Sequence, residues 1–187
     1  MDISLEEIAQ LTEQYGGAWG INHTRRLTAL IDTIEDGREY DREALELAVL
    51  LHDWGAYPVW AKEGMEHDVR SVEVAGQFLA EHGCEEQVED LVLTCIASHH
   101  SQSADLPYEA ILLRDADVLD FLGTVGVLRD FSKNPRNMRK AREVVDKRMQ
   151  SLPGCLVLSK AKELAVQRMR EMEELLNRFE RDSFGYY

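Results

Sequence analysis

The sequence has few of the features that mark secreted or membrane proteins. Its 187 residues contain only three cysteines, Cys84, Cys95 and Cys155, and these are odd in number and far apart. Neither a disulfide framework nor a thiolate zinc site is therefore expected. No segment approaches the roughly 18 consecutive apolar residues of a membrane span, and no basic region followed by an apolar stretch opens the chain. We expect a cytoplasmic protein that has no contact with a membrane.

Positive charge is also scarce. The chain has 21 Lys and Arg residues against 35 Asp and Glu residues, which gives a formal net charge of -14. This balance argues against general affinity for nucleic acid or for an anionic lipid surface, because both attract basic patches. A small anionic substrate would need local positive charge or a metal ion.

The pattern of apolar residues favours helices. There is no alternating apolar run long enough to suggest a sheet, and no internal repeat. With 187 residues, 44% of them hydrophobic, the chain can form one domain with a full core. We predict an all-α fold with a single domain over residues 1–187. Its core would cover about residues 15–125, and C-terminal helices at about residues 135–182 would pack on it.

Short polar signals predict where helices begin. Ser4 and Glu7 form a capping box before a first helix. Asp41 is expected to cap the helix that carries His52 and Asp53, and Asn134 to cap a later one. Helix ends are predicted near four glycine positions: Gly16–Gly17, Gly37, Gly55 and Gly83. A fourth helix should span about residues 67–82, and a long charged helix about residues 156–181.

The adjacent pair His52 and Asp53 is the most informative feature. It directly follows residues 44–51, a run that is apolar enough to belong in a core. A buried carboxylate is costly unless something neutralises it. A divalent cation would do so, and histidine beside aspartate is a common ligand pair. The pair therefore indicates a metal enzyme.

Two histidines end the apolar stripe of a further helix. At about 100° per residue, one face carries a stripe that continues to His99, and His100 lies about 100° away from it. The stripe consists of Val88, Leu91, Val92, Cys95 and Ile96. A lone histidine there could be a core residue bonded to a backbone carbonyl. The concentration of histidines near other metal-binding positions favours a role in a site.

Periodicity does not choose among three nearby aspartates. Asp115, Asp117 and Asp120 lie in residues 112–122, where apolar residues point in nearly every direction. One of the three is expected to be buried against a cation.

Basic residues beside these positions have two interpretations. Each could contact phosphate or serve as a surface charge in an acidic chain: Arg25, Arg26, Lys62, Arg70 and Arg114. The charged terminal helix alternates basic and acidic residues, which is typical of an exposed or self-associating face. A homodimer is one possibility.

The ordered set His23, His52, Asp53 and Asp117 resembles the HD superfamily of metal-dependent phosphohydrolases. Residues 23–27 (His-Thr-Arg-Arg-Leu) resemble the opening motif of that family, and residues 50–55 (Leu-Leu-His-Asp-Trp-Gly) its signature helix. Residues 114–120 (Arg-Asp-Ala-Asp-Val-Leu-Asp) are similar to the closing motif, in which the aspartate after alanine binds metal. The resemblance covers roughly residues 15–182 and selects Asp117.

The resemblance implies a helical bundle around a metal site. His23, His52, Asp53 and Asp117 would bind a divalent cation, commonly manganese, magnesium, iron, nickel, cobalt or zinc. Four protein ligands leave an octahedral ion two open positions, for a water and a phosphoryl oxygen. The cation would lower the pKa of the water and withdraw charge from phosphorus.

Three further histidines widen the choice of chemistry. Some branches of the superfamily add histidines that build a second metal position bridged by the aspartate of the pair. Here His67 and His99 are suitably placed, with His100 as an addition. Their alternative role is to contact substrate without touching metal. Asp53, His67 and His99 are thus the candidate catalytic residues.

We expect hydrolysis of a phosphate ester or anhydride, most readily of a nucleotide, by a metal-activated water. Arg26, Lys62, Arg70 and His100 are the candidate substrate contacts. One alternative is a di-iron oxygenase that acts on a small polar substrate, for which the extra histidines would supply ligands. Another is a metal-stabilised binding or regulatory module without catalysis, which is disfavoured because all four expected ligands are present.

Overall fold

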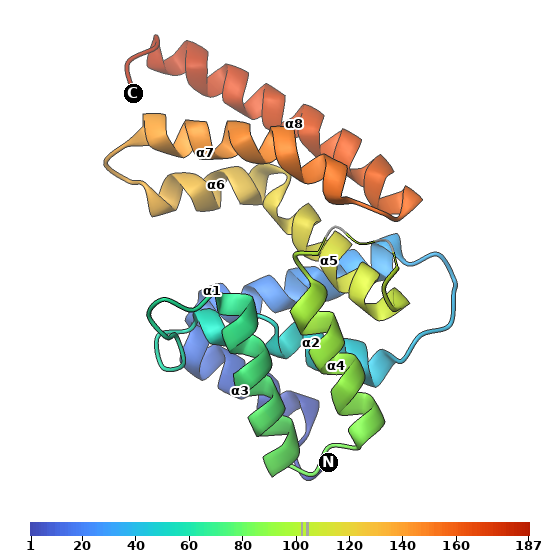
Figure 1. Ribbon diagram of the computed structural model, residues 1–187. Helices are drawn as coiled ribbons and strands as arrows, with labels where there is room; N and C mark the ends of the chain where they lie inside the picture. Colours follow the sequence, from blue (N-terminus) through green and yellow to red (C-terminus); the bar gives the residue numbers. More distant parts are fainter. Residues whose placement is uncertain (102, 104) are drawn as a thin grey trace. The chain divides into compact units, whose positions relative to one another are not determined.

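A computed structural model describes residues 1–101, 103 and 105–187. Over these residues the chain forms eight α-helices and two short 3-10 helices without a strand (Figure 1). The all-α prediction is confirmed. None of these helices is long and apolar enough to cross a membrane. Contacts divide the chain into two compact units, Met1–Arg114 and Asp115–Tyr187. The single-domain boundary at 1–187 stays a prediction.

The first unit opens with α1, Leu5–Ile34, which begins at the predicted capping box. The Ser4 hydroxyl accepts from the backbone N–H of Glu7, and the Glu7 carboxylate accepts from the backbone N–H of Ser4. Gly17 interrupts the helix with a φ of 63°, a left-handed conformation that glycine adopts without steric cost. The two helices expected on either side of Gly16–Gly17 are thus joined directly across a kink.

Helix α2, Arg42–Leu51, begins as predicted at Asp41, whose side chain accepts from Ala44 N–H. Its end differs from the prediction. Regular helix stops at Leu51, His52 is the C-cap, and the 3-10 helix η1 follows at Trp54–Ala56. The two ligand candidates therefore lie at a helix end, where a tight turn presents both side chains, and not in the helix interior.

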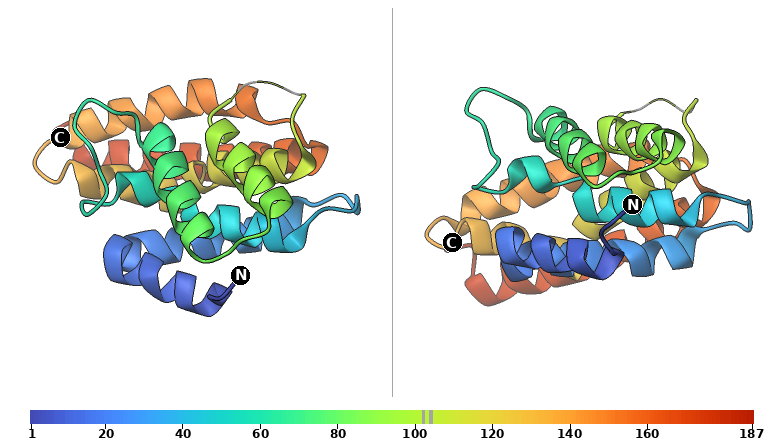
Figure 2. Two further views of the ribbon diagram at one scale, coloured as in Figure 1. Left: turned by 60° about the horizontal axis from the view of Figure 1, so that its bottom comes forward. Right: turned by 90° about the horizontal axis from the view of Figure 1, so that it is seen from below.

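Helices α3, His67–Glu81, and α4, Glu86–Ser98, run side by side (Figure 2). Helix α3 ends as expected before Gly83, which has a φ of 64°. In α4 the predicted stripe is buried at Val92, Cys95 and Ile96. Helix α5, Tyr108–Phe121, begins in the first unit and ends in the second.

The second unit continues with α6 (Thr124–Lys133), α7 (Met138–Ser151), η2 (Leu152–Cys155) and α8 (Ser159–Ser183). Helix α6 contacts both α7 and α8. The prediction that Asn134 caps a helix start is wrong. Asn134 instead ends α6, where its side chain donates to the carbonyl of Asp130, and the cap of α7 is Asn137, which accepts from Lys140 N–H.

Candidate metal centre

The turn after α2 fixes the protonation pattern of His52. Its Nδ1 lies 2.9 Å from the carbonyl oxygen of Val49. Since a carbonyl can only accept, Nδ1 is the donor in this contact, and in the neutral form of the ring Nε2 has the lone pair. This is how proteins commonly orient a histidine that binds metal.

His23 from α1 meets His52 at this lone pair. The two Nε2 atoms are 3.3 Å apart, and the side-chain oxygen Oδ2 of Asp53 lies 3.7 Å from His23 Nε2 and 3.6 Å from His52 Nε2. Both histidines are buried, and the Asp53 side chain is 13% exposed. Three of the four predicted ligands therefore converge within one unit.

These three side chains fit a divalent cation. With bonds of about 2.1 Å, neighbouring ligand atoms around a cation lie about 3.0 to 3.4 Å apart. The observed separations of 3.3 to 3.7 Å are close to this range. A cation would also neutralise the largely buried carboxylate, which the two histidines in their neutral forms would not.

A second group of ligand atoms is formed by His67, His99 and His100. His99 is buried at the end of α4 and directs its Nδ1 to the carbonyl of Ile96 at 2.6 Å, so its Nε2 also keeps a lone pair. The His67 and His100 side chains are 38% and 47% exposed. This second group therefore lies at the solvent-facing side of the site.

Asp53 lies between the two groups. Its Oδ2 faces His23 and His52, whereas its Oδ1 lies 3.8 Å from Nε2 of His67. The rings of His52 and His99 are also close, with centroids 5.4 Å apart. One carboxylate can thus serve both groups.

Close backbone packing places His67 beside Asp53. Gly55 N–H donates to the Ser71 hydroxyl at 2.8 Å. A Cβ on Gly55 would lie 2.4 Å from both the carbonyl oxygen of His67 and the backbone nitrogen of Ser71. Only glycine permits this approach of η1 to the first turn of α3. Trp54 secures the other side, since its Nε1 donates to the buried Thr12 hydroxyl at 3.0 Å.

Asp117 belongs to the second unit and is buried on α5. Its two neighbouring candidates have structural partners. Asp115 accepts the backbone N–H groups of Val157 and Leu158 at 2.9 and 2.8 Å, and Asp120 forms a 2.6 Å ion pair with Arg129. These contacts satisfy the carboxylates of Asp115 and Asp120 without a cation. This agrees with the prediction that Asp117 is the metal ligand among the three.

The predicted phosphate contacts differ in their surroundings. Arg26 is half-buried on α1, and Lys62 is exposed in the segment between η1 and α3. Arg70 donates to the carbonyl of Trp60 and to the Glu73 carboxylate, both at 2.7 Å. The Glu73 carboxylate therefore already balances the charge of Arg70. The substrate roles of all three residues stay predictions.

Sequence reasoning overlooked two side chains that touch these groups. The Trp19 ring stacks on His23 with centroids 6.0 Å apart and is 41% exposed. An Oδ2 of Asp68 lies 3.8 Å from Nδ1 of His100. Trp19 precedes His23 by four residues on one helix, and this spacing was the available signal. Asp68 depends on the pairing of α3 with α4, for which the sequence has no local signal.

The HD domain family matches residues 20–122, which is more than half of the chain. The chain belongs to the HD domain family. The matched range includes all four predicted ligands and both histidine groups. HD domains bind divalent metals, and the structure places candidate ligands accordingly. No curated protein matches the chain by sequence.

Solved structures share the fold along nearly the whole chain. A predicted HD superfamily hydrolase from an uncultured Thermotogales bacterium is 24% identical, with a TM-score of 0.69 over 95% of this chain and 92% of that one. YpgQ from Bacillus subtilis, solved in complex with ADP, is 22% identical, with a TM-score of 0.72 over 95% and 94%. An HD-superfamily hydrolase from Bacillus thuringiensis is 23% identical, with a TM-score of 0.71 over 95% of each chain. At these identities the likeness shows the fold.

Proposed function

We propose that this HD domain is a divalent-metal-dependent hydrolase of a phosphate ester or anhydride, with a nucleotide as substrate. The observation that carries the proposal is the convergence of His23, His52 and Asp53 at 3.3 to 3.7 Å. Asp117 would complete the ligand set from α5. Membership in the HD family and the hydrolases that share the fold support this chemistry.

A phosphorylated substrate agrees with the charges around the site. The chain carries a net charge of -14, so a polyanion would be repelled unless a cation compensates locally. Arg26 and Lys62 would add positive charge beside the cation. The ADP bound to YpgQ, a protein of the same fold, makes a nucleoside phosphate the preferred substrate class.

Each residue of the metal centre would have a separate role in the reaction. A bound cation would lower the pKa of a coordinated water and withdraw charge from phosphorus. His52 would keep its Nε2 lone pair available because Val49 holds the proton on Nδ1. Asp53 would orient toward the cation through Oδ2 and leave Oδ1 for the His67 side. Burial of His23 and His52 would keep bulk water from the ligand atoms.

His67, His99 and His100 would act at the substrate side. The group has two candidate roles, as ligands of a second cation or as direct contacts to phosphate. The position of Asp53 between both groups favours the second cation, since a carboxylate can bridge two ions. Elemental analysis of the purified protein distinguishes these roles, because a second cation gives about two metals per chain and loss of His99 should remove one.

The hydrolase proposal is tested with manganese-loaded protein and a panel of nucleotides. Wild type should release phosphate or pyrophosphate from at least one of them, and His52→Ala and Asp53→Ala should lose both metal and turnover. His82→Ala is the matched control, because His82 pairs with Asp2 at the end of α3 and belongs to neither histidine group. Absence of turnover by wild type, or unchanged turnover by both site variants, would reject the proposal.

The di-iron oxygenase is the second candidate, favoured by the two ligand groups around Asp53. It requires two irons in anaerobically purified protein and oxygen consumption with a small polar substrate. About one metal per chain without oxygen consumption would exclude it.

A further inference from the structure

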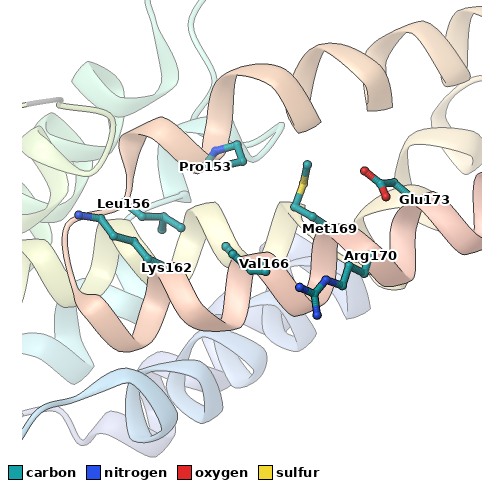
Figure 3. Close-up of a pocket in the computed structure, with 8 residues that line it drawn as sticks. Pro153, Leu156, Lys162, Val166, Met169, Arg170 and Glu173 are labelled. Carbon is teal, nitrogen blue, oxygen red and sulfur yellow. The ribbon is translucent and has the colours of Figure 1, made fainter.

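One side of α8 borders an apolar groove of about 450 Å³ (Figure 3). Pro153 and Leu156 lie at one end of the groove, where the chain enters α8. The helix itself contributes Lys162, Ala165, Val166, Met169, Arg170 and Glu173. Val166 is 53% exposed although it is apolar. An apolar strip bordered by charges is typical of a surface that another helix covers.

The groove residues of α8 have a symmetric order. Lys162, Val166, Met169 and Glu173 recur at intervals of four, three and four residues, so they share one helix face. Their common midpoint falls between residues 167 and 168. Reversing the direction of the helix about this midpoint exchanges Lys162 with Glu173 and Val166 with Met169.

The strip formed by Lys162, Val166, Met169 and Glu173 has a charged residue at each end. Neither Lys162 nor Glu173 has an ion-pair partner in the part of the chain that the structure describes. Both are exposed. If a second α8 helix runs antiparallel to the first, each lysine at one end of the strip therefore faces a glutamate of the other helix.

We propose that a second copy of this chain covers the groove, with the two α8 helices antiparallel about a twofold axis between residues 167 and 168. Lys162 would pair with the partner subunit's Glu173, and the symmetry would repeat this ion pair at the other end. Val166 would pack against the partner subunit's Met169 in between. A twofold interface needs a surface complementary to itself, which this order of residues provides.

Self-association explains the pattern better than a different partner would. Two copies that each carry a charge of -14 repel one another, so their contact requires a strip where positive and negative charges meet. A foreign helix would need only an apolar stripe and would place no constraint on the spacing of Lys162 from Glu173. Since one helix pair forms a small interface, we expect a reversible dimer of micromolar affinity.

Sedimentation of charge-reversal variants tests the proposed antiparallel pairing of the two α8 helices. Wild type should show a monomer–dimer equilibrium that depends on concentration. Lys162→Glu places glutamate opposite glutamate at both ends, and Glu173→Lys places lysine opposite lysine. Each should weaken dimerisation about tenfold or more, because symmetry doubles each change. The double variant Lys162→Glu/Glu173→Lys restores opposite charges across the axis and should dimerise nearly as wild type does.

Glu171→Lys is the matched control, because it makes the same change of charge on α8 about 200° around the helix from Glu173. It should dimerise as wild type does. Circular dichroism checks that every variant remains helical. A monomeric wild type would overturn the proposal, as would single reversals without effect or a double variant that stays monomeric. The outcome is independent of the proposed function, since no residue of this strip belongs to the metal centre.

Discussion

The backbone of Gly55 lies so close to Ser71 that a Cβ at residue 55 would come within 2.4 Å of the Ser71 nitrogen. The Gly55 N–H also donates to the Ser71 hydroxyl. This contact joins the turn that carries Asp53 to the helix that begins with His67. The geometry between the two histidine groups therefore depends on a residue that binds nothing itself.

Gly55→Ala should destabilise the fold by about 1 to 3 kcal/mol, because the new methyl group overlaps backbone atoms that cannot rotate away. It should also weaken metal binding by displacing Asp53 relative to His67. Urea unfolding and metal titration measure the two effects. Gly154→Ala is the control, since a Cβ there meets nothing within 4 Å, and it should leave both unchanged.

Metal binding should stabilise the folded protein through Asp53. At a cation concentration about 100 times the dissociation constant, binding adds about 2.7 kcal/mol to the free energy of unfolding. For a chain of this size that corresponds to a rise in Tm of about 5 to 10 °C. Asp53→Asn should lose most of the rise, whereas Asp146→Asn, in an ion pair with Arg142 on α7, should keep it. An equal rise in both variants would contradict the assignment of Asp53.

Asp115 and Asp117 should separate stability from metal binding. Asp115→Ala leaves the backbone N–H groups of Val157 and Leu158 without their acceptor, so it should lower the free energy of unfolding by several kcal/mol, at about 1 to 3 kcal/mol for each unsatisfied group. Asp117→Ala should instead lower the metal content. Unfolding curves in the presence of a chelator, together with elemental analysis, measure the difference. The reverse pattern would mean that the two aspartates have been assigned wrongly.

Removal of two buried hydroxyl groups, those of Tyr57 and Thr12, should change the free energy of unfolding in different ways. The Tyr57 hydroxyl has no hydrogen-bond partner within the described part of the chain, and burial raises the pKa of Tyr57 far above its ordinary value. Tyr57→Phe should therefore be neutral or stabilising by about 1 kcal/mol. Thr12→Val removes the acceptor of Trp54 Nε1 and should destabilise by about 1 to 3 kcal/mol. Thermal unfolding of both variants provides the comparison, and a clear loss of stability in Tyr57→Phe would show that its hydroxyl is bonded.

Burial of Cys95 should make stability fall at alkaline pH. It raises the pKa of the Cys95 thiol from an ordinary value of 9.0 to about 12. Below pH 9 the thiol is protonated in both the folded and the unfolded state, so burial of Cys95 contributes fully to stability there. Between these values unfolding releases a proton, and stability falls by about 1.4 kcal/mol per pH unit. Urea unfolding of wild type and Cys95→Ala at several pH values isolates the effect, because the variant should lack this part of the slope.

Local signals predicted much of the fold. The capping box at Ser4 and the Asp41 cap are present, because the side chain that bonds the first turn lies within three residues of it. The same reasoning failed at Asn134, since Asn137 competes for the same role and only one of them lies next to the start of α7. Local patterns do not decide between such neighbours.

The sequence named candidate metal ligands but not their geometry. Periodicity left Asp115, Asp117 and Asp120 equivalent, and the resemblance to a family selected Asp117. Tertiary contacts distinguish the three aspartates in the structure. Asp115 accepts a hydrogen bond from the backbone just before α8, and Asp120 forms an ion pair with Arg129. Contacts of this kind join residues far apart in the sequence and leave no spacing to detect.

The side chain of Tyr57 rests on α1 at Gly16 and Gly20, where any Cβ would overlap its ring or hydroxyl. This anchor comes only four residues after Asp53. Trp60 continues the anchor, because its ring stacks on Trp54 with centroids 4.5 Å apart and its carbonyl accepts from Arg70. Beyond Trp60 the chain becomes exposed, with Lys62 and Gly64 open to solvent and Gly64 at a φ of 76°. Motion in this segment can therefore begin after Trp60 without shifting Asp53. A fixed metal-ligand candidate and a lysine exposed to an arriving anion are thus separated by two anchored aromatic rings, Tyr57 against two glycines and Trp60 against Trp54.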